Sequence, residues 1–195
     1  MKHTLFALAI LAACASGAQA QPREPGAEAA APRQARAAMP ATVQLAFTPW
    51  DDAEGMIVDG IRQARQQILV QAYSFTSRTI ANALIAAMRR GVDVRVMADR
   101  EQTFGGESSR IPDLVQAGIP VVLEARYQSA HNKVMVLDVG TAGAAVITGS
   151  YNWTYAAQYK NAENVIILRN NPDIVSAYAA NWRRHYAEAL PYAAP

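Results

Sequence analysis

Hydrophobic and polar residues follow two periods along this chain, one typical of strands and one typical of helices. Residues 42–48 (TVQLAFT) and 92–98 (VDVRVMA) alternate at every second position, which predicts strands. Residues 67–75 (QILVQAYSF) are expected to form a strand because they are rich in branched and aromatic side chains. Shorter apolar runs predict further strands at 120–123, 133–137, 144–148 and 164–168.

Helical spacing of apolar residues separates these strands. Residues 52–65 predict one helix, and a second is expected to start at Ser77 as its N-cap and to stop at Gly91. A short helix should end near Ala117, and the last helix should begin at Asn171, which is followed by proline. Strands that alternate with helices of this length predict an α/β fold, with a mixed β-sheet flanked by helices.

The N-terminal segment has the pattern of a signal peptide. Lys2 gives a positive start, residues 5–13 form an apolar run too short to span a membrane, and residues 18–20 (AQA) form a small-residue cleavage site. We therefore interpret residues 1–20 as a signal peptide. The mature protein is expected to be exported, either to the periplasm or into the medium.

The same segment has a second interpretation. Residues 11–14 (LAAC) resemble a bacterial lipobox, in which case Cys14 would be lipidated and would anchor the protein. Cys14 is the only cysteine, so an intrachain disulfide and a metal site made of cysteines are excluded. Both interpretations place the protein outside the cytoplasm.

Composition sets the domain limits and excludes a strongly basic nucleic-acid binder. Residues 21–41 are rich in Ala, Pro and Arg without periodicity, which predicts a disordered linker. Residues 42–195 are left as one folded domain. The 18 Lys and Arg residues against 16 Asp and Glu residues give a net charge of +2, so a polyanionic partner must be bound by local contacts.

Candidate chemistry gathers in residues 131–164. His131 and Lys133 are two positions apart, so on a strand both side chains would lie on the same face. Ser150 and Asn152 have the same spacing just after a glycine turn. A lysine with serine and asparagine donors can bind a tetrahedral oxyanion such as phosphate, and a histidine beside it can attack phosphorus.

Two carboxylates belong to the same stretch. Asp138 lies five residues beyond Lys133, so it is expected at the end of the strand or behind it. Glu163 stands beside the start of the next strand. A carboxylate that holds one imidazole nitrogen makes the other nitrogen available as a nucleophile.

These spacings resemble a known family. Residues 131–138 (HNKVMVLD) fit the HxK(x)4D pattern of the phospholipase D superfamily, and 149–152 (GSYN) with 163–164 (EN) fit its downstream phosphate-site residues. The region 42–186, including QAYSFTS at 71–77, is similar to the short bacterial endonuclease branch, which carries one motif per chain. The resemblance implies an α-β-α sandwich.

The resemblance also implies a two-step reaction without a metal ion or other cofactor. One His131 would attack phosphorus and form a phosphohistidine, and a second would protonate the leaving oxygen. Lys133 and Asn152 would hold nonbridging oxygens, and Glu163 would bind the imidazole of His131. The supporting residues would be Ser150, which also binds phosphate, and Asp138, which is counted among the catalytic residues.

The reaction needs two histidines, and the count of histidines is informative. The chain has His3 in the predicted signal peptide, His131 and His185. We therefore expect a homodimer whose two-fold axis brings two copies of His131 together at one active site. The alternative is that His185 serves as the acid, although a residue near the end of the last helix is usually structural.

Three functions follow from these features. The first is a nuclease that cleaves DNA or RNA, the second is a phospholipase D that hydrolyses phospholipid headgroups, and the third is a non-catalytic envelope binding protein. Tyr151, Trp153 and Tyr155 are candidates to stack on bases, with core packing as the alternative. Four cations are candidates for phosphate contacts, with ordinary solvated charges as the alternative: Arg89, Arg90, Arg110 and Lys160.

Overall fold

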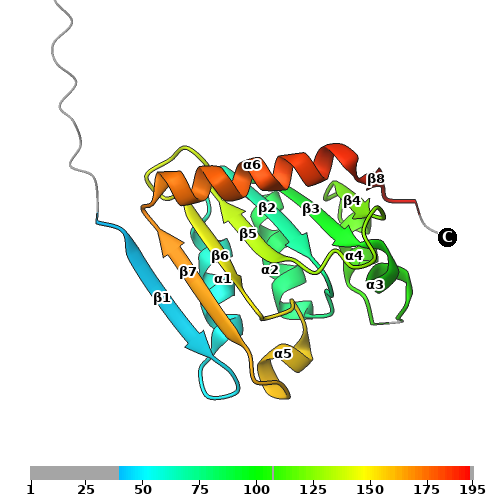
Figure 1. Ribbon diagram of the computed structural model, residues 1–195, viewed down its shortest axis with the longest axis horizontal. Coiled ribbons are helices and arrows are strands. Elements are labelled where there is room, and N and C mark those ends of the chain that lie inside the picture. The colour runs from blue at the N-terminus through cyan, green and yellow to red at the C-terminus, as the bar shows by residue number, and fades with distance from the viewer. Residues whose placement is uncertain (1–39, 107, 194–195) are drawn as a thin grey trace, which may run out of the picture. The chain divides into compact units, whose positions relative to one another are not determined.

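The computed structural model describes residues 40–106 and 108–193 (Figure 1). The predicted signal peptide and all but the last two residues of the predicted linker lie outside the described residues. The strands are β1 (Thr42–Phe47), β2 (Gln67–Ala72), β3 (Asp93–Asp99), β4 (Val121–Glu124), β5 (Lys133–Leu137), β6 (Ala145–Gly149), β7 (Asn164–Arg169) and β8 (Leu190–Pro191). The helices are α1 (Ala53–Gln63), α2 (Arg78–Arg89), α3 (Arg100–Phe104), α4 (Ile111–Gln116), α5 (Tyr155–Tyr159) and α6 (Pro172–Glu188).

The strands form one sheet in the order β1-β7-β6-β5-β2-β3-β4-β8. β2, β3 and β4 are parallel, and their crossover connections carry the helices α2 to α4. β5 pairs with β2 in the antiparallel sense, and β6, β7 and β1 continue as antiparallel neighbours. The predicted mixed sheet flanked by helices is confirmed.

Helices cover both faces of the sheet (Figure 1). Ile57 of α1 and Leu84 of α2 belong to one core together with Ile68 of β2. The next strand residue, Leu69, points to the other face and joins a second core under Trp182 of α6. Successive side chains of β2 thus pack into two different cores. Burying each large apolar side chain contributes about 1.5–3 kcal/mol to the stability of the fold.

The predicted helix boundaries rest on specific caps. Ser77 accepts a hydrogen bond from the backbone N–H of Ile80 at 3.1 Å and starts α2. Gly91 follows the end of α2 with φ of +89°, a conformation that favours glycine. Asn171 caps α6 by accepting from the N–H of Ile174 at 3.1 Å. The sequence predictions at these termini are confirmed.

Other elements differ from the predictions. α3, α5 and β8 were not predicted, because elements of two to five residues are too short to show a period. β2 ends at Ala72 and not at residue 75. The chain turns away there because the N–H groups of Thr76 and Ser77 donate to the carbonyl of Trp153, at 2.8 and 2.9 Å, and not to a neighbouring strand.

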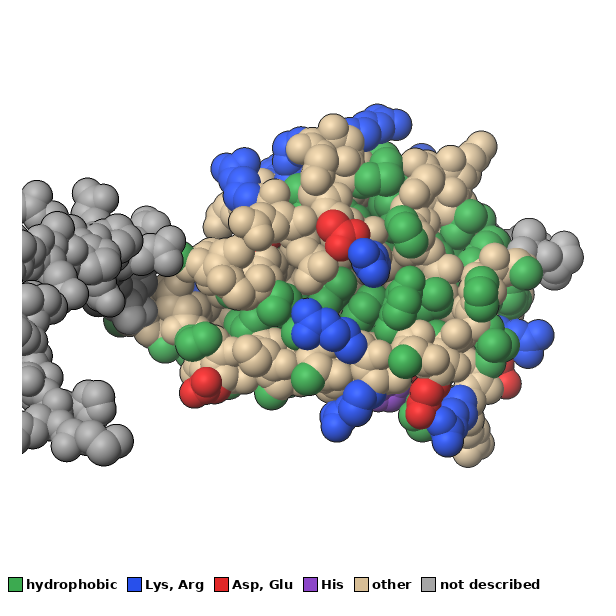
Figure 2. All heavy atoms as spheres, turned by 90° about the horizontal axis from the view of Figure 1, so that it is seen from above, with side chains coloured by type: hydrophobic (Ala, Val, Ile, Leu, Met, Phe, Trp, Pro, Cys, Tyr) green, Lys and Arg blue, Asp and Glu red, His purple; other side chains and the backbone are tan. Residues whose placement is uncertain are grey.

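The surface of the described domain matches its small net charge. On the face seen in Figure 2, Lys and Arg side chains stand singly or in small groups with hydrophobic side chains between them. Over residues 40–106 and 108–193, the helices are too short or too polar to cross a membrane.

Candidate active site

Five of the six predicted site residues meet at one edge of the sheet, among them Lys133, the first residue of β5. His131 lies two residues before β5, Ser150 and Asn152 follow β6, and Glu163 directly precedes β7. Because β5, β6 and β7 are successive antiparallel neighbours, the start of β5, the end of β6 and the start of β7 lie side by side. The parallel strands β2 and β3 also end at this edge.

His131 and Lys133 are in direct contact, as their spacing predicts. The ammonium Nζ of Lys133 lies 2.9 Å from Nδ1 of His131 and donates to the His131 carbonyl at 2.8 Å. An ammonium has only donor hydrogens, so Nδ1 accepts and the proton of a neutral ring lies on Nε2. The side chain of His131 is exposed, whereas Lys133 is 6% exposed. Burial lowers the pKa of Lys133, and the nearby Glu163 carboxylate opposes that effect.

Tyr73 also belongs to this group, although the sequence did not single it out. Its ring centroid lies 4.3 Å from that of His131, and Nζ of Lys133 stands 4.8 Å from the same ring centroid. Tyr73 is the first residue after β2, which is the strand paired with β5. The sequence does carry a signal, since residues 71–77 resemble the family, but the apolar pattern of 67–75 predicts Tyr73 as an ordinary strand residue.

Glu163 is held by its own loop and not by His131. Its Oε2 accepts from the Ser150 hydroxyl at 2.6 Å and its Oε1 from the Asn161 amide at 3.0 Å. Ser150 in turn accepts from the backbone and side-chain N–H groups of Asn164 at 3.0 and 3.2 Å. The hydroxyl hydrogen of Ser150 is therefore committed to Glu163. This arrangement makes Ser150 a support of Glu163, and within the described chain Glu163 does not contact the His131 imidazole.

Asn152 is half-buried with unused hydrogen-bonding capacity. Its Oδ1 is buried without a partner among the described residues, and its Nδ2 makes no hydrogen bond to them either. Buried polar groups are normally paired, so an unpaired amide at this edge fits a group that completes its contacts with a ligand.

Asp138 does not join this group. It follows β5 at the opposite edge of the sheet, with φ of +50°. Its buried carboxylate accepts from the backbone N–H groups of Arg65, Gln66 and Gln67, with shortest distances of 2.8, 2.7 and 3.0 Å. Five strand residues at about 3.3 Å each place it about 16 Å from Lys133. The geometry agrees with the expected strand-end position and offers no direct part in catalysis.

His185 is also separated from His131. Its Nδ1 lies 2.6 Å from Oε1 of Glu124, whose Oε2 accepts from the amide of Gln71 at 3.0 Å. Glu124 ends β4, and β2 and β3 lie between β4 and β5. Three strand spacings of about 4.8 Å give about 14 Å between those strands. The alternative that His185 acts as the acid beside His131 is not supported.

The predicted base-stacking aromatics divide into two kinds. Tyr151 and Trp153 are each 1% exposed, so they pack in the core, and burial raises the pKa of Tyr151. Trp153 donates from its indole Nε1 to the carbonyl of Gln71 at 3.2 Å. Tyr155 is exposed and packs against Tyr159 in a tilted arrangement, with ring centroids 4.6 Å apart.

Two of the four predicted phosphate-contacting cations are engaged elsewhere. Arg90 donates to the carbonyl of Ile61 at 3.1 Å, behind the C-terminus of α1. Arg110 pairs with Asp113 at 3.1 Å. Lys160 stands 6.0 Å from the ring centroid of Tyr155 and is exposed, and Arg89 in the last turn of α2 is also exposed, so these two remain available.

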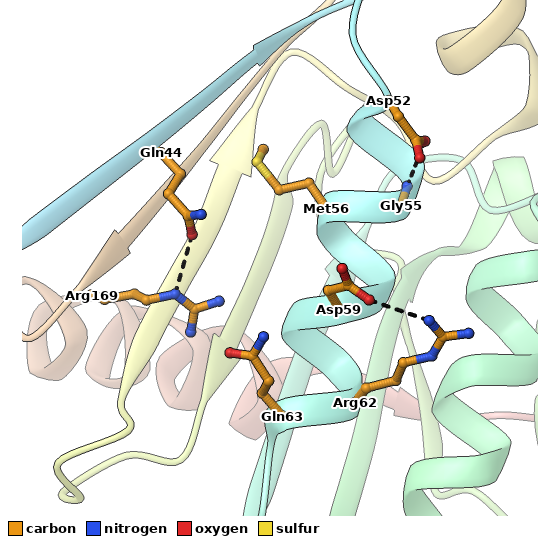
Figure 3. Close-up of a pocket in the computed structure, with 8 residues that line it drawn as sticks. All are labelled: Gln44, Asp52, Gly55, Met56, Asp59, Arg62, Gln63 and Arg169. Atoms are coloured by element: carbon orange, nitrogen blue, oxygen red, sulfur yellow. Dashed lines mark hydrogen bonds and ion pairs between the residues drawn. The ribbon is translucent and has the colours of Figure 1, made fainter.

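A separate cavity of about 480 Å³ lies between β1 and α1 (Figure 3). In it Arg169 donates to Gln44 at 3.3 Å, and Asp59 pairs with Arg62 at 3.2 Å. Burial lowers the pKa of Arg169. The cavity contains none of the residues of the sheet edge, and the described residues hold no cluster of three or more His, Cys, Asp or Glu side chains suited to a metal.

Comparison with known proteins agrees with this architecture. The family model described as "Cardiolipin synthase, PLD-like domain" matches residues 57–186. Nuc from Salmonella typhimurium, a phospholipase D family member, superposes with a TM-score of 0.74 at 30% identity, covering 80% of this chain and 100% of that one. The chain belongs to the phospholipase D superfamily.

Two relatives within the superfamily have names that describe lipid substrates. Phospholipase D of Rickettsia prowazekii is 38% identical over 140 residues, which are 72% of this chain and 65% of that protein. Mitochondrial cardiolipin hydrolase of Xenopus laevis is 32% identical over 141 residues, 72% of this chain and 64% of that protein. The chain thus spans slightly less than two thirds of these relatives. The family model, the fold and the names agree on the phospholipase D superfamily.

Proposed function

We propose that the chain is an exported, metal-independent endonuclease that hydrolyses DNA or RNA phosphodiester bonds through a phosphohistidine. The observation that carries the proposal is the exposed imidazole of His131 in contact with the buried ammonium of Lys133. The unpaired amide of Asn152 follows the neighbouring strand β6. One nucleophile and two donors for nonbridging oxygens are the minimum set for attack on a phosphodiester.

The proposed reaction has two steps. In the first, Nε2 of one His131 attacks phosphorus, the P–N bond forms, and the bond to the leaving oxygen breaks as a second His131 donates a proton to it. In the second, that second histidine takes a proton from water, the resulting oxygen attacks phosphorus, and the P–N bond breaks. Lys133 and Asn152 hold the nonbridging oxygens throughout, where negative charge develops.

We propose that the second histidine comes from a second copy of the chain. His131 as a nucleophile needs a free lone pair on Nε2, so Nδ1 must carry the proton and donate it to an acceptor. The observed contact of Nδ1 is with Lys133, which cannot accept. A two-fold dimer would supply both the second imidazole and a second Glu163 carboxylate as the acceptor.

Nucleic acid is favoured as the substrate by the resemblance to the short bacterial endonuclease branch, and the match to Nuc agrees with a short chain of that kind. That match covers the whole of Nuc, whereas about a third of each lipid-named relative lies outside the matched region. The exposed position of His131 at a sheet edge also suits a long polymer that must pass across the site.

Phospholipid is the second candidate, and one specific observation favours it. Trp50 is 83% exposed, and Tyr155 and Tyr159 are also exposed. The loop of Trp50 is tied to α5 by Gln158, which donates to the carbonyl of Asp51 at 2.9 Å. Exposed tryptophan and tyrosine side chains suit the interface of a lipid bilayer.

The test is hydrolysis by the purified chain in EDTA, with plasmid DNA, RNA and vesicles of phosphatidylcholine or cardiolipin as substrates. The proposal expects nucleic-acid cleavage that EDTA does not affect. His131→Ala should reduce the rate of hydrolysis by at least about 10³-fold, and the matched variant His185→Ala should keep the rate of the parent. Hydrolysis of lipid without cleavage of nucleic acid would establish the second candidate, and activity that requires added metal would refute the mechanism.

A further inference from the structure

Tyr73 touches both reactive groups of the candidate site. Its ring lies 4.3 Å from the His131 ring by centroids, with an interplanar angle of 50°. The Lys133 ammonium stands 4.8 Å from the centroid of the same ring. Since Nζ of Lys133 is also 2.9 Å from Nδ1 of His131, the three side chains form a closed triangle.

The backbone holds Tyr73 in this place from two sides. Its N–H donates to the carbonyl of Asn132 at 2.9 Å, which extends the pairing of β2 and β5 by one residue. Three residues later, Thr76 donates to the carbonyl of Trp153 at 2.8 Å. The short segment between these bonds leaves the ring little freedom to move away from His131.

Core packing does not account for Tyr73. Neither buried core of the described chain includes it, and its side chain is half-buried at the rim. Its hydroxyl makes no hydrogen bond to the described residues. Its ring contacts the ring of His131 and the ammonium of Lys133, which points to a role in the site.

We propose that Tyr73 is a positioning residue for the phosphohistidine chemistry of His131. The face of an aromatic ring carries negative charge density, so it attracts the Lys133 ammonium and a histidine ring that becomes cationic. The ring therefore holds the imidazole beside Lys133. This inference rests on the proposed function, but the contact itself can be tested without any substrate.

The first test is spectroscopic. In protein labelled at histidine, the ring C–H signals of His131, assigned with His131→Ala, should lie upfield because Tyr73 shields them. Tyr73→Phe should keep that shift, and Tyr73→Leu should abolish it. The matched control is Tyr178→Leu, which changes a partly buried tyrosine of α6 packed against the second core and should leave the signals in place. An unchanged shift in Tyr73→Leu would overturn the proposal.

The second test is kinetic and uses bis(p-nitrophenyl) phosphate, a small phosphodiester without bases or acyl chains. Tyr73→Leu should lower kcat at least about 10-fold with KM changed less than about 3-fold, since misplacing a nucleophile affects the chemical step. Tyr73→Phe should restore kcat to within about 2-fold, because the ring and not the hydroxyl acts. Equal kcat values for Tyr73→Leu and the parent would refute the role.

The two arms separate two kinds of failure. If the parent chain hydrolyses neither this ester nor nucleic acid, the proposed function fails, while the spectroscopic arm still decides whether Tyr73 holds His131. If the parent is active and Tyr73→Phe is as impaired as Tyr73→Leu, a role of the hydroxyl replaces the one proposed.

Discussion

The side chain of Lys133 is 6% exposed, yet its ammonium has no carboxylate within salt-bridge distance among the described residues. Its hydrogen bonds go to a carbonyl and to an imidazole nitrogen, both on His131. Removing a charge from water without a paired opposite charge is unfavourable, which is the physical cause of the lowered pKa of Lys133. The same unpaired charge is available for a phosphate.

We predict that Lys133→Met loses activity but not stability. Losing one donor to the developing oxyanion should lower kcat by about 10²–10³-fold. The folded pKa of Lys133 is lowered from 10.5, so the folded chain binds this proton more weakly than the unfolded chain does. The charged Lys133 therefore destabilises the folded chain. This destabilisation is complete below the folded pKa of Lys133 and disappears as the pH rises towards 10.5. The melting temperature of the variant at pH 7 should therefore equal or exceed that of the parent.

Thermal unfolding followed by circular dichroism at pH 7 and pH 10 checks this expectation. If the variant melts at a higher temperature than the parent at pH 7, that difference should be smaller at pH 10. Lys160→Met is the matched control, since Lys160 is exposed and should show no such dependence. A melting temperature for Lys133→Met well below the parent at pH 7 would contradict it.

At the level of single residues, the sequence predicted contacts that depend on short spacings. The pair of His131 and Lys133 is two positions apart, and the strand period alone brings them to one side. Tyr73 is 58 residues before His131, so their contact depends on the pairing of β2 with β5. The sequence predicts a hydrogen bond from the His131 imidazole to Glu163, but the carboxylate of Glu163 accepts from Ser150 and Asn161 instead. No local pattern in the sequence shows which of these donors Glu163 binds.

At the level of elements, β5 is fixed at both ends. Its first residues lie in the candidate site, and Asp138 follows its last residue. The Asp138 carboxylate receives three successive backbone N–H groups, from residues 65–67, where the chain leaves α1 and enters β2. A carboxylate that accepts several backbone hydrogen bonds stabilises the connection between these two elements.

We predict that Asp138→Asn lowers the free energy of unfolding by about 2–3 kcal/mol, because an amide nitrogen would face backbone donors. Asparagine tolerates the positive φ of this position, so the change tests the carboxylate and not the backbone. Urea unfolding measures the loss. Asp113→Asn, at an exposed ion pair with Arg110, is the control and should change stability by less than about 1 kcal/mol.

The catalytic rate of folded Asp138→Asn should stay within a few-fold of the parent, because the residue lies at the far edge. A loss of activity as large as that of His131→Ala, in a variant shown to be folded, would restore Asp138 to the catalytic set.

The elements that the sequence predicted are those with a clear period or a cap. α2 and α6 have both, and their limits are set by Ser77 and Asn171. α5 has five residues between two site loops, which is too short to show a period, although Thr154 caps it. The order of the strands was not predicted, because apolar runs do not specify which strand pairs with which.

At the level of the whole molecule, the first strand presents an apolar face. Val43, Leu45 and Phe47 are all exposed on β1, an edge strand of the sheet. Contiguous exposed apolar side chains often mark a surface that another molecule covers. Phe47 is beside Asn164 in the sheet, close to the candidate site, so this face supports the proposed dimer.

We predict that mixtures of parent and His131→Ala chains lose activity faster than in proportion. If each site needs two histidines, only parent dimers are active, so an equal mixture after exchange retains about a quarter of the parent activity. A monomer that works alone would retain about half. Mixing with His185→Ala should leave the activity unchanged, and light scattering of the parent should give the mass of a dimer.

The hydrogen bonds of Trp153 link two loops that come from distant parts of the sequence. The carbonyl of Trp153 accepts from Thr76 and Ser77, and its indole donates to Gln71, so the exit of β2 and the exit of β6 are joined. Over evolutionary time these two loops should resist insertions and deletions, because a change in length would break the hydrogen bonds that join them. The β5–β6 turn at the other edge has open space around Gly140 and should vary freely in length.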